Sequence, residues 1–443
     1  MPADPQPDPE FEDGLVRAFD QAAEHVRSES QPLVTGGLVR GRVRRRRRRI
    51  AALTGSVTAV AVIAGGGLFA AALGSSPPVP TSHALTEAAR SAPPRLDKGV
   101  NILLMGVDSR TALDGSAVPD SLVRDQLHAG SSDLGGFLTD TLLVLHIPAG
   151  GDGRVEAVSI PREDYVQSAG ADGGMQKISY VYGIAKAAAE AKLQGKGLSP
   201  AQLAQQGSEA GRTATIATVQ QFLGIPIDHF AEVDMLGFYD IAQAVGPIQV
   251  CLNHATSDSL GSGFSGRAGI NTLDPAQALA FVRQRHGLPN ADLDRTHRQQ
   301  AFIASALHTL GQQGLFGDLG KAQGLLAAVK KDVVIDDQWN LLDFMQQVPD
   351  LVGGNVEFNT LPITGFATVS TRGFEESVNT VDPVRIRQVV QQLFGGAPAA
   401  SGSPASGAAL PSAPTAPTAP TASGGAPPVG PAVQGNEGIP CVD

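Results

Sequence analysis

The chain has 443 residues, of which 42% are hydrophobic and 17% are charged, a balance typical of a globular protein rather than a disordered one. Its formal net charge is −10 at pH 7, and the acidic excess lies in the part that follows residue 49. An acidic surface disfavours general binding to a polyanion, so we expect no nucleic-acid partner.

The N-terminal region divides into three segments of different composition. Residues 1–39 are acidic and Pro-rich, which predicts a disordered tail. Residues 40–49 form an arginine-rich neck, and residues 50–73 carry no charge and are long enough to cross a bilayer. The positive-inside rule then predicts a single transmembrane helix with a cytoplasmic N-terminus, and it places the rest of the chain outside the cell membrane. A cleaved export signal is the alternative.

The part after the apolar segment has a folded centre and two low-complexity flanks. Residues 74–98 are rich in Pro, Ser and Ala, and we expect them to be an extracytoplasmic linker. The folded domain is expected at residues 99–395, where strand and helix patterns occur. Residues 396–443 form a Pro/Ala/Ser/Thr-rich tail that we expect to be flexible and that ends near Cys441.

Strand patterns alternate with helix patterns along the domain. The expected strands are short apolar runs, at 100–105, 141–147, 155–160, 229–233 and 248–252. The expected helices follow capping signals and helical periodicity, at 210–223, 236–245, 275–282, 292–307, 321–331, 341–348 and 383–393. The second and third strands form a hairpin. This alternation predicts an α/β fold, with a mixed central β-sheet sandwiched between α-helices.

Two carboxylates fall at one edge of the expected sheet. Pairing Ile147 with Arg154 across the hairpin turn places Asp140 within one residue of Arg162. If the first strand runs parallel to the third, Asp108 emerges at the same edge, where ligands of α/β sheets gather. Each aspartate taken singly has a common structural explanation, so the hypothesis of a shared site depends on their convergence.

A short stretch between residues 281 and 300 contains four arginines, Arg283, Arg285, Arg295 and Arg298. Arginine binds phosphate oxygens through two parallel hydrogen bonds, so this cluster indicates an anion site. Arg283 and Arg285 would diverge on a continuous helix, and they point the same way only if the chain unwinds there. Arg295 and Gln299 are four residues apart and share one helix face. Surface salt bridges are the alternative explanation.

The two cysteines, Cys251 and Cys441, lie in the part that we expect outside the membrane, where disulfides persist. A bond between them would tie the flexible end of the chain back onto the folded domain. Two free thiols are the alternative.

Several catalytic motifs are absent from the sequence. It contains no G-x-x-x-x-G-K-[ST] loop, no G-x-S-x-G elbow, no H-E-x-x-H and no C-x-x-C. ATP hydrolysis, serine hydrolysis and zinc chemistry therefore have no support.

Six segments occur in an order that resembles the LytR-CpsA-Psr family of membrane-anchored cell-wall enzymes. They are NILLMGVDSR at 101–110, TDTLLVLHI at 139–147, VSIPREDY at 158–165, KISYVYG at 177–183, VDMLGFYDIAQAVG at 233–246, and the block from ALAFVRQRH at 278–286 to DRTHRQQ at 294–300. Each segment alone is a weak signal, and the ordered set after one transmembrane segment is specific. The resemblance covers roughly residues 99–395.

The resemblance implies a membrane-bound phosphotransferase that moves an anionic glycopolymer from a polyprenyl-pyrophosphate carrier onto a peptidoglycan acceptor. It implies that Asp108 and Asp140 hold Mg²⁺ as the cofactor. It also implies a set of pyrophosphate ligands that carry cationic or amide donors, Arg162, Arg283, Arg285, Arg295 and Gln299. Within this site, the residues expected to be catalytic are Asp140, Arg283 and Arg285.

The sequence departs from the family pattern at two places. The family usually has Arg-Asp where this chain has Arg162-Glu163, so the carboxylate is kept but lengthened. Leu138 and Thr139 replace an Arg-Ser pair before Asp140, which removes one arginine from that position.

Two other functions are compatible with the same residues. The chain could bind a polyprenyl pyrophosphate, or attenuate a signal, without turnover. It could also hydrolyse a polyprenyl-pyrophosphate saccharide, with water in place of the acceptor hydroxyl.

Overall fold

The computed structural model describes residues 79–112, 137–149, 154–170, 173–259, 261–314, 332–340, 356–371, 374–395, 435–436 and 439–443, together with the single positions 118, 121, 123, 325 and 330. The predicted tail, arginine-rich neck and transmembrane segment lie outside the described residues, as does the predicted helix at 341–348. Only two residues of the predicted helix at 321–331 are described. Within the described ranges, no helix combines the length and the hydropathy that crossing a membrane requires.

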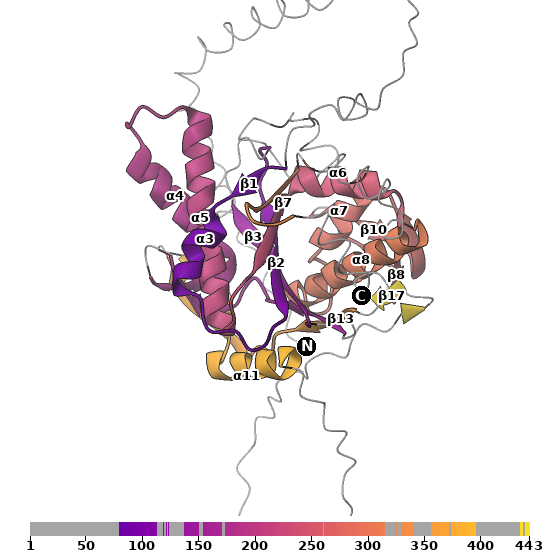
Figure 1. Cartoon of the computed structure of the whole chain (residues 1–443). Coiled ribbons are helices and arrows are strands. Elements are labelled where there is room, and N and C mark those ends of the chain that lie inside the picture. Colours follow the sequence, from indigo (N-terminus) through magenta and orange to yellow (C-terminus); the bar gives the residue numbers. More distant parts are fainter. Residues whose placement is uncertain are drawn as a thin grey trace, which may run out of the picture. The chain divides into compact units, whose positions relative to one another are not determined.

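A seven-stranded mixed sheet forms the centre of the fold, in the order β1-β12-β7-β2-β3-β4-β13 (Figure 1). Its strands are β1 (Thr81–Ser82), β2 (Val100–Asp108), β3 (Leu138–Ile147), β4 (Val155–Ser159), β7 (His229–Asp234), β12 (Val333–Asp336) and β13 (Val356–Thr360). The pairs β1/β12, β2/β7 and β4/β13 are parallel, and the other neighbours are antiparallel. The predicted mixed sheet is confirmed.

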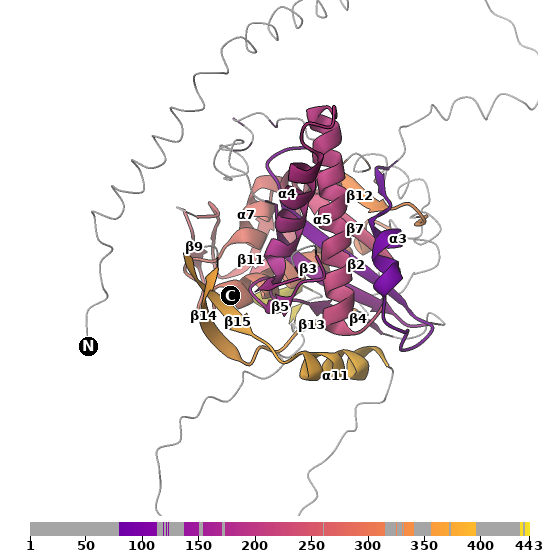
Figure 2. The same cartoon turned by 90° about the vertical axis from the view of Figure 1, so that its left-hand side faces the viewer.

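Helices cover both faces of this sheet (Figures 1 and 2). One face packs against α3 (Ala84–Ala88), α5 (Pro200–Leu223) and α11 (Pro383–Phe394), and α4 (Val181–Leu193) packs against α5. On the opposite side lie α6 (Met235–Val245), α7 (Pro275–Arg283) and α8 (Asp292–Gln312).

Strand β3 explains why the sheet needs two helical layers. Its side chains alternate between faces, so Leu142 and Val144 join the core beneath α5, whereas Leu143 packs toward Ile303 of α8. Because both faces of β3 are apolar, each has to be covered.

A smaller sheet in the order β11-β8-β17-β16 lies beside α8. It consists of β8 (Ile248–Leu252), β11 (Gly269–Leu273), β16 (Gly435–Asn436) and β17 (Ile439–Val442). Cys441 pairs in register with Cys251, and their sulfurs form a disulfide, so the predicted bond is present in the structure. The prediction of a flexible tail is wrong for its last residues, because β17 pairs in parallel with β8.

The predicted linker also contains folded residues. Ser82 in β1 pairs with Asp336, and Ala84, Leu85 and Ala88 of α3 are buried in the main core. These elements are only two and five residues long, too short to produce a periodic pattern. The folded domain therefore begins before residue 99.

The helical pair α4 and α5 was predicted only in part. Helix α5 begins at Pro200 rather than at residue 210, with Ser199 and Gln202 forming a capping box. A Cβ atom on Gly211 would lie 2.7 Å from the ring of Tyr182, so a larger residue there would push α4 away from α5. Gly211 lowers the helix propensity of α5, but it permits the close contact between α4 and α5.

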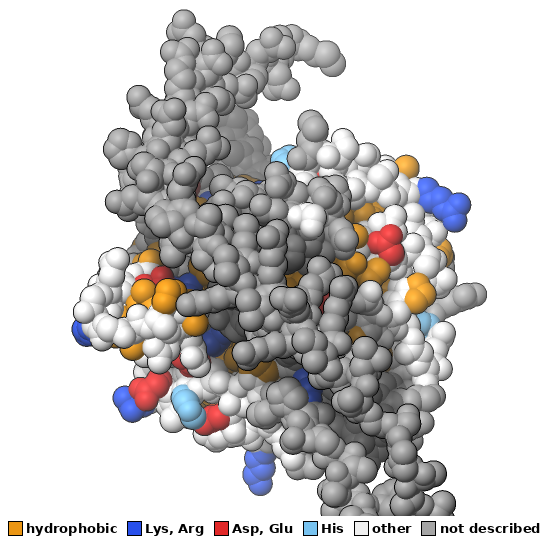
Figure 3. All heavy atoms as spheres, turned by 90° about the horizontal axis from the view of Figure 1, so that it is seen from above, with side chains coloured by type: hydrophobic (Ala, Val, Ile, Leu, Met, Phe, Trp, Pro, Cys, Tyr) orange, Lys and Arg blue, Asp and Glu red, His pale blue; other side chains and the backbone are white. Residues whose placement is uncertain are grey.

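Three shorter hairpins complete the described part of the chain. They pair β5 (Tyr165–Gln167) with β6 (Met175–Lys177), β9 (Thr256–Ser257) with β10 (Ser265–Gly266), and β14 (Gly365–Thr371) with β15 (Phe374–Thr380). A 3-10 turn at Ala89–Ser91 follows α3, and another at Ile178–Tyr180 leads from β6 into α4. Among the described side chains that are visible in Figure 3, acidic and basic ones lie near one another.

Candidate active site

Two adjacent strand ends bring the predicted carboxylates to one place. Asp108 is the last residue of β2 and Asp140 is near the start of β3, and these strands are antiparallel neighbours. Asp108 lies opposite Leu138 after a bulge at Gly106 and Val107. Both aspartates line the same pocket. The predicted convergence of Asp108 and Asp140 therefore occurs in the structure.

Asp140 joins the hairpin to helix α8. Its Oδ1 lies 3.2 Å from Nη1 of Arg162, and its Oδ2 lies 3.9 Å from Nη1 of Arg295. Gln299 donates a long hydrogen bond of 3.5 Å to the backbone oxygen of Asp140. The hairpin register differs by one residue from the prediction, since Leu145 pairs with Ala157, but Arg162 still reaches Asp140.

The arginines of the 281–300 stretch are separated by a break between two helices. Helix α7 ends at Arg283, and Gln284 is extended with φ −59° and ψ 135°. The predicted unwinding between Arg283 and Arg285 is therefore present. The side chain of Arg285 is 44% exposed, and its Nη1 lies 3.8 Å from Oδ1 of Asp292. The same Asp292 oxygen lies 2.9 Å from Nη2 of Arg295, so one carboxylate holds two arginines.

Burial disfavours the charged form of two of these arginines, and the neighbouring carboxylates offset that effect only in part. It lowers the pKa of Arg283 and of Arg295, and neighbouring arginines lower both further. Burial also disfavours the charged form of Arg162, but Asp140 and Glu163 outweigh it and raise the pKa of that guanidinium. Among the described residues, the buried Nε of Arg295 has no hydrogen-bond partner. An anionic ligand would satisfy such a donor.

Behind the charged groups lies an apolar pocket with a volume of about 230 Å³. Its polar lining residues are Asp108, Asp140, Thr141, Asp234, Arg283, Arg295 and Gln299. The apolar lining comes from the two strands β2 and β7 and the three helices α6, α7 and α8, through Leu104, Val107, Ala231, Val233, Met235, Phe238, Ile241, Leu279, Val282, Phe302 and Ile303. The site therefore combines charged groups at one end with an apolar pocket behind them.

The two aspartates have the chemistry of a divalent-cation site. Burial and the nearby Asp140 raise the pKa of Asp108, because two carboxylates repel one another when both are ionised. The buried Oδ1 of Asp108 accepts no hydrogen bond from the described residues, although Arg110 lies 3.7 Å from Oδ2. The described part of the chain contains no group of three His, Cys, Asp or Glu residues that could hold a metal. Mg²⁺ is commonly held by one or two carboxylates plus substrate phosphates, so the pair fits that ion.

Three residues near the site were not nominated from the sequence. Arg110 follows Asp108 by two positions in the same motif, and this proximity could have identified it. Asp292 is the first residue of α8, where an acidic side chain is usual for helix stability, and its contact with two arginines depends on the tertiary structure. Glu163 contacts Nε of Arg162 at 3.1 Å.

Arg298 does not belong to the anion site, contrary to its place in the predicted cluster. It is fully buried, donates to Gln284 at 2.9 Å and also donates to the backbone oxygen of Asp443. The rings of Phe264 and Phe281 lie 5.3 and 4.8 Å from its guanidinium carbon. Arg298 thus joins the helix break to the small sheet.

Known proteins with similar sequences are named for cell wall biosynthesis and for teichoic acid transfer. Cell wall biosynthesis protein LcpA of Corynebacterium glutamicum is 38% identical over 300 residues, which are 68% of this chain and 56% of that protein. Polyisoprenyl-teichoic acid–peptidoglycan teichoic acid transferase TagU of Bacillus licheniformis is 28% identical over 244 residues, 54% of this chain and 62% of the relative. The chain thus spans less than two thirds of the length of these relatives.

Solved structures and a family model give matches over a similar region. The crystal structure of B. subtilis TagV aligns with a TM-score of 0.47 and 20% identity, covering 68% of this chain and 99% of that one. The model of the LytR_cpsA_psr family matches residues 79–366, well over half of the sequence. The chain therefore belongs to the LytR-CpsA-Psr family.

Proposed function

We propose that this protein is a membrane-anchored phosphotransferase that moves an anionic glycopolymer from a polyprenyl-pyrophosphate carrier onto peptidoglycan. The observation that carries the proposal is the meeting of Asp108, Asp140, Arg283 and Arg295 at one end of an apolar pocket. A polyprenyl pyrophosphate has the matching design, a diphosphate on a long apolar chain. The name of TagU, a teichoic acid transferase, supports this kind of reaction, and the name of LcpA supports a role in cell wall biosynthesis.

The proposed binding mode divides the substrate between two environments. The diphosphate lies against Arg162, Arg283, Arg285, Arg295 and Gln299, and the first isoprene units enter the apolar pocket. Burial lowers the pKa of Arg283 and Arg295, so the negative charge of the diphosphate would stabilise the charged form of both side chains. Burial of the lipid adds a hydrophobic contribution of about 0.8 kcal/mol per CH₂ group.

The proposed reaction exchanges one phosphorus–oxygen bond for another. An acceptor hydroxyl attacks the phosphorus next to the saccharide, the bond to polyprenyl phosphate breaks, and the proton of the hydroxyl passes to the departing phosphate or to solvent. The product is a phosphodiester between the glycopolymer and peptidoglycan. Arg283, Arg285 and Arg295 stabilise charge on the transferring group and on the departing phosphate. Asp108 and Asp140 would hold Mg²⁺, which when bound neutralises charge on phosphate oxygens.

The proposed topology follows from the sequence. Residues 50–73 anchor the protein as a single transmembrane helix, the N-terminus remains in the cytoplasm, and the folded domain works outside the cytoplasmic membrane. Its substrate is then held in the same bilayer as its anchor.

The proposal is tested by incubating the full-length protein in detergent with a polyprenyl-pyrophosphate saccharide, Mg²⁺ and peptidoglycan. A covalent polymer product is expected. Free sugar phosphate would instead indicate hydrolysis, and retention of the lipid without reaction would indicate a binding protein. Arg283→Ala and Asp140→Ala are expected to abolish transfer and keep the fold, whereas Arg385→Ala on the exposed side of α11 is the matched control. Full activity in both site variants would refute the assignment.

A further inference from the structure

One residue separates two of the proposed diphosphate ligands, and its side chain points away from them. Helix α7 ends at Arg283, and Gln284 is extended before Arg285. Across an extended residue, the side chains on either side of it point the same way, and its own side chain points the opposite way. Gln284 is fully buried, whereas the side chain of Arg285 is 44% exposed. The extended conformation of Gln284 therefore directs both arginines to one side of the chain.

Three segments of the chain hold the side-chain amide of Gln284. Its Nε2 donates to Oγ1 of Thr256 in β9 at 2.7 Å and to the backbone oxygen of His286 at 2.9 Å. Its Oε1 accepts a hydrogen bond of 2.9 Å from Nη1 of Arg298 in α8. An amide side chain has two donor hydrogens and one acceptor oxygen, so both polar atoms of Gln284 are paired inside the protein. Because Gln284 and His286 flank Arg285, the bond between them fixes the backbone on both sides of that arginine.

The partner of this amide in α8 is itself held in place. Arg298 lies against the rings of Phe264 and Phe281, and its Nε donates to the backbone oxygen of Asp443. Burial lowers the pKa of Arg298 to about 10, so its side chain is charged at pH 7. Its bond to Gln284 is therefore charge-assisted, a stronger kind of hydrogen bond than one between neutral groups.

The break after α7 places the two arginines at the charged end of the active site. Arg283 lines the pocket together with Asp108. Nη1 of Arg285 lies 3.8 Å from the Asp292 oxygen that also holds Arg295. If α7 continued past Arg283, the side chains of Arg283 and Arg285 would point to nearly opposite sides of the helix, because each residue turns a helix by about 100°. A single diphosphate could not contact both arginines in that arrangement.

We propose that Gln284 is a positioning residue, which holds the break between α7 and α8 in the conformation that turns Arg283 and Arg285 toward the same diphosphate. This inference rests on the proposed function, because it names what orients two of the diphosphate ligands in that reaction. Gln284 acts through the arginines and does not contact the diphosphate, since its amide is paired with Thr256, His286 and Arg298.

Gln284→Met tests the proposal, because it removes the three side-chain hydrogen bonds at similar volume and unchanged charge. The Tm should decrease, since Arg298 loses a buried acceptor. Well below that Tm, kcat for transfer should be about tenfold lower with the acceptor KM unchanged, because displaced arginines stabilise the transition state less. Thr256→Val removes one of the three partners, and Thr256 does not line the active-site pocket. This milder variant should lower kcat about threefold.

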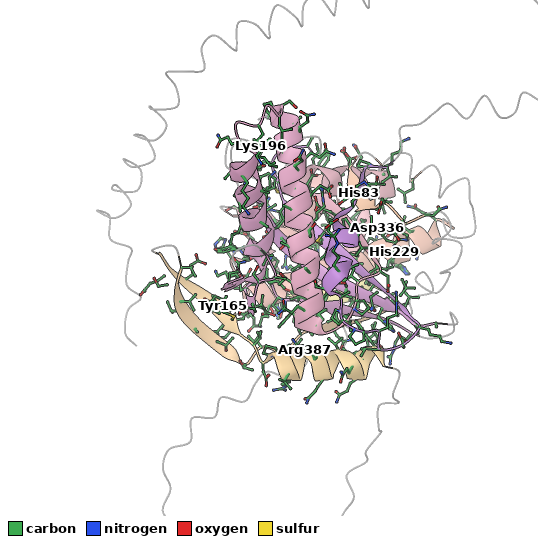
Figure 4. The ribbon with its side chains drawn as sticks, turned by 60° about the vertical axis from the view of Figure 1, so that its left-hand side comes forward. His83, Tyr165, Lys196, His229, Asp336 and Arg387 are labelled. Carbon is green, nitrogen blue, oxygen red and sulfur yellow. A yellow bond between two sulfur atoms is a disulfide. The ribbon has the colours of Figure 1, made fainter. Side chains whose placement is uncertain are left out.

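A destabilised control separates positioning from a general loss of stability. Ile386→Ala removes apolar volume from the main core and should lower the Tm at least as much as Gln284→Met does. Ile386 is in α11, the helix that carries the labelled Arg387 in Figure 4, and α11 packs against α5 on the sheet face opposite α7 and α8. Below its Tm, Ile386→Ala should keep the wild-type kcat. A decrease in kcat as large as that of Gln284→Met would overturn the inference.

Binding of inorganic pyrophosphate separates this inference from the proposed function. The full-length proteins in detergent with Mg²⁺ are titrated with pyrophosphate by calorimetry, without any lipid donor. A Kd about tenfold higher in Gln284→Met and unchanged in Ile386→Ala supports the inference, even if the wild type transfers no polymer. A wild-type Kd and kcat in both Gln284→Met and Thr256→Val would overturn it, even if the wild type transfers polymer. If Gln284→Met does not fold, a wild-type Kd and kcat in Thr256→Val would overturn it alone.

Discussion

The disulfide between Cys251 and Cys441 permits a quantitative prediction of stability. It closes a loop with a sequence separation of 190 residues. In the chain-entropy description, a cross-link over that length destabilises the unfolded chain by about 5 kcal/mol at 25 °C. The double variant Cys251→Ser/Cys441→Ser loses this contribution. For a domain of this size, the loss corresponds to a decrease in Tm of roughly 10 °C.

The assay is thermal unfolding of the wild type and the double variant, each with and without a reductant. The wild type should shift to the Tm of the variant when reduced, and the variant should not respond. Neither cysteine lines the active-site pocket, so transfer activity well below the Tm should be retained. A variant Tm within about 2 °C of the oxidised wild type would refute the reasoning, because pairing of β17 with β8 would then suffice to hold that strand.

Three further substitutions test the site and its surroundings. Arg295→Lys keeps the charge but loses the planar fork, and transfer assays should show a decrease in kcat/KM of about a hundredfold; unchanged kinetics would contradict bidentate binding. Ala231→Phe fills the apolar pocket and should raise the KM for a long polyprenyl donor about tenfold, but not the KM for a short-chain analogue. An equal rise in both KM values would contradict binding of the lipid in this pocket. Burial raises the pKa of Asp234 to about 7, so the folded protein keeps a proton that the unfolded chain releases. The proton on Asp234 stabilises the folded protein fully below about pH 4, and this stabilisation is lost as the pH rises to 7, which lowers the free energy of unfolding by about 4 kcal/mol. In urea unfolding, the free energy of unfolding of Asp234→Asn should therefore depend less on pH than that of the wild type. Parallel pH curves for the two proteins would contradict this assignment.

The sequence alone determined the features that depend on neighbours along the chain. The apolar runs of β2, β3 and β4 and the capping box at Asp274 identify their elements, because strand and helix patterns are local. Hairpin pairing placed Asp140 beside Arg162 despite a register error of one residue, since a short turn restricts where the returning strand can lie.

The tertiary structure decided which distant side chains meet. Helical periodicity places Gln299 on the same face of α8 as Arg295. It does not reveal that Arg298, the residue before Gln299, packs against the rings of Phe264 and Phe281. The short elements β1 and α3 and the strand β17 were missed because their order comes from partners more than a hundred residues away in the sequence. Local patterns encode which face of an element is apolar, whereas the choice of partner for that face depends on the packing of the whole domain.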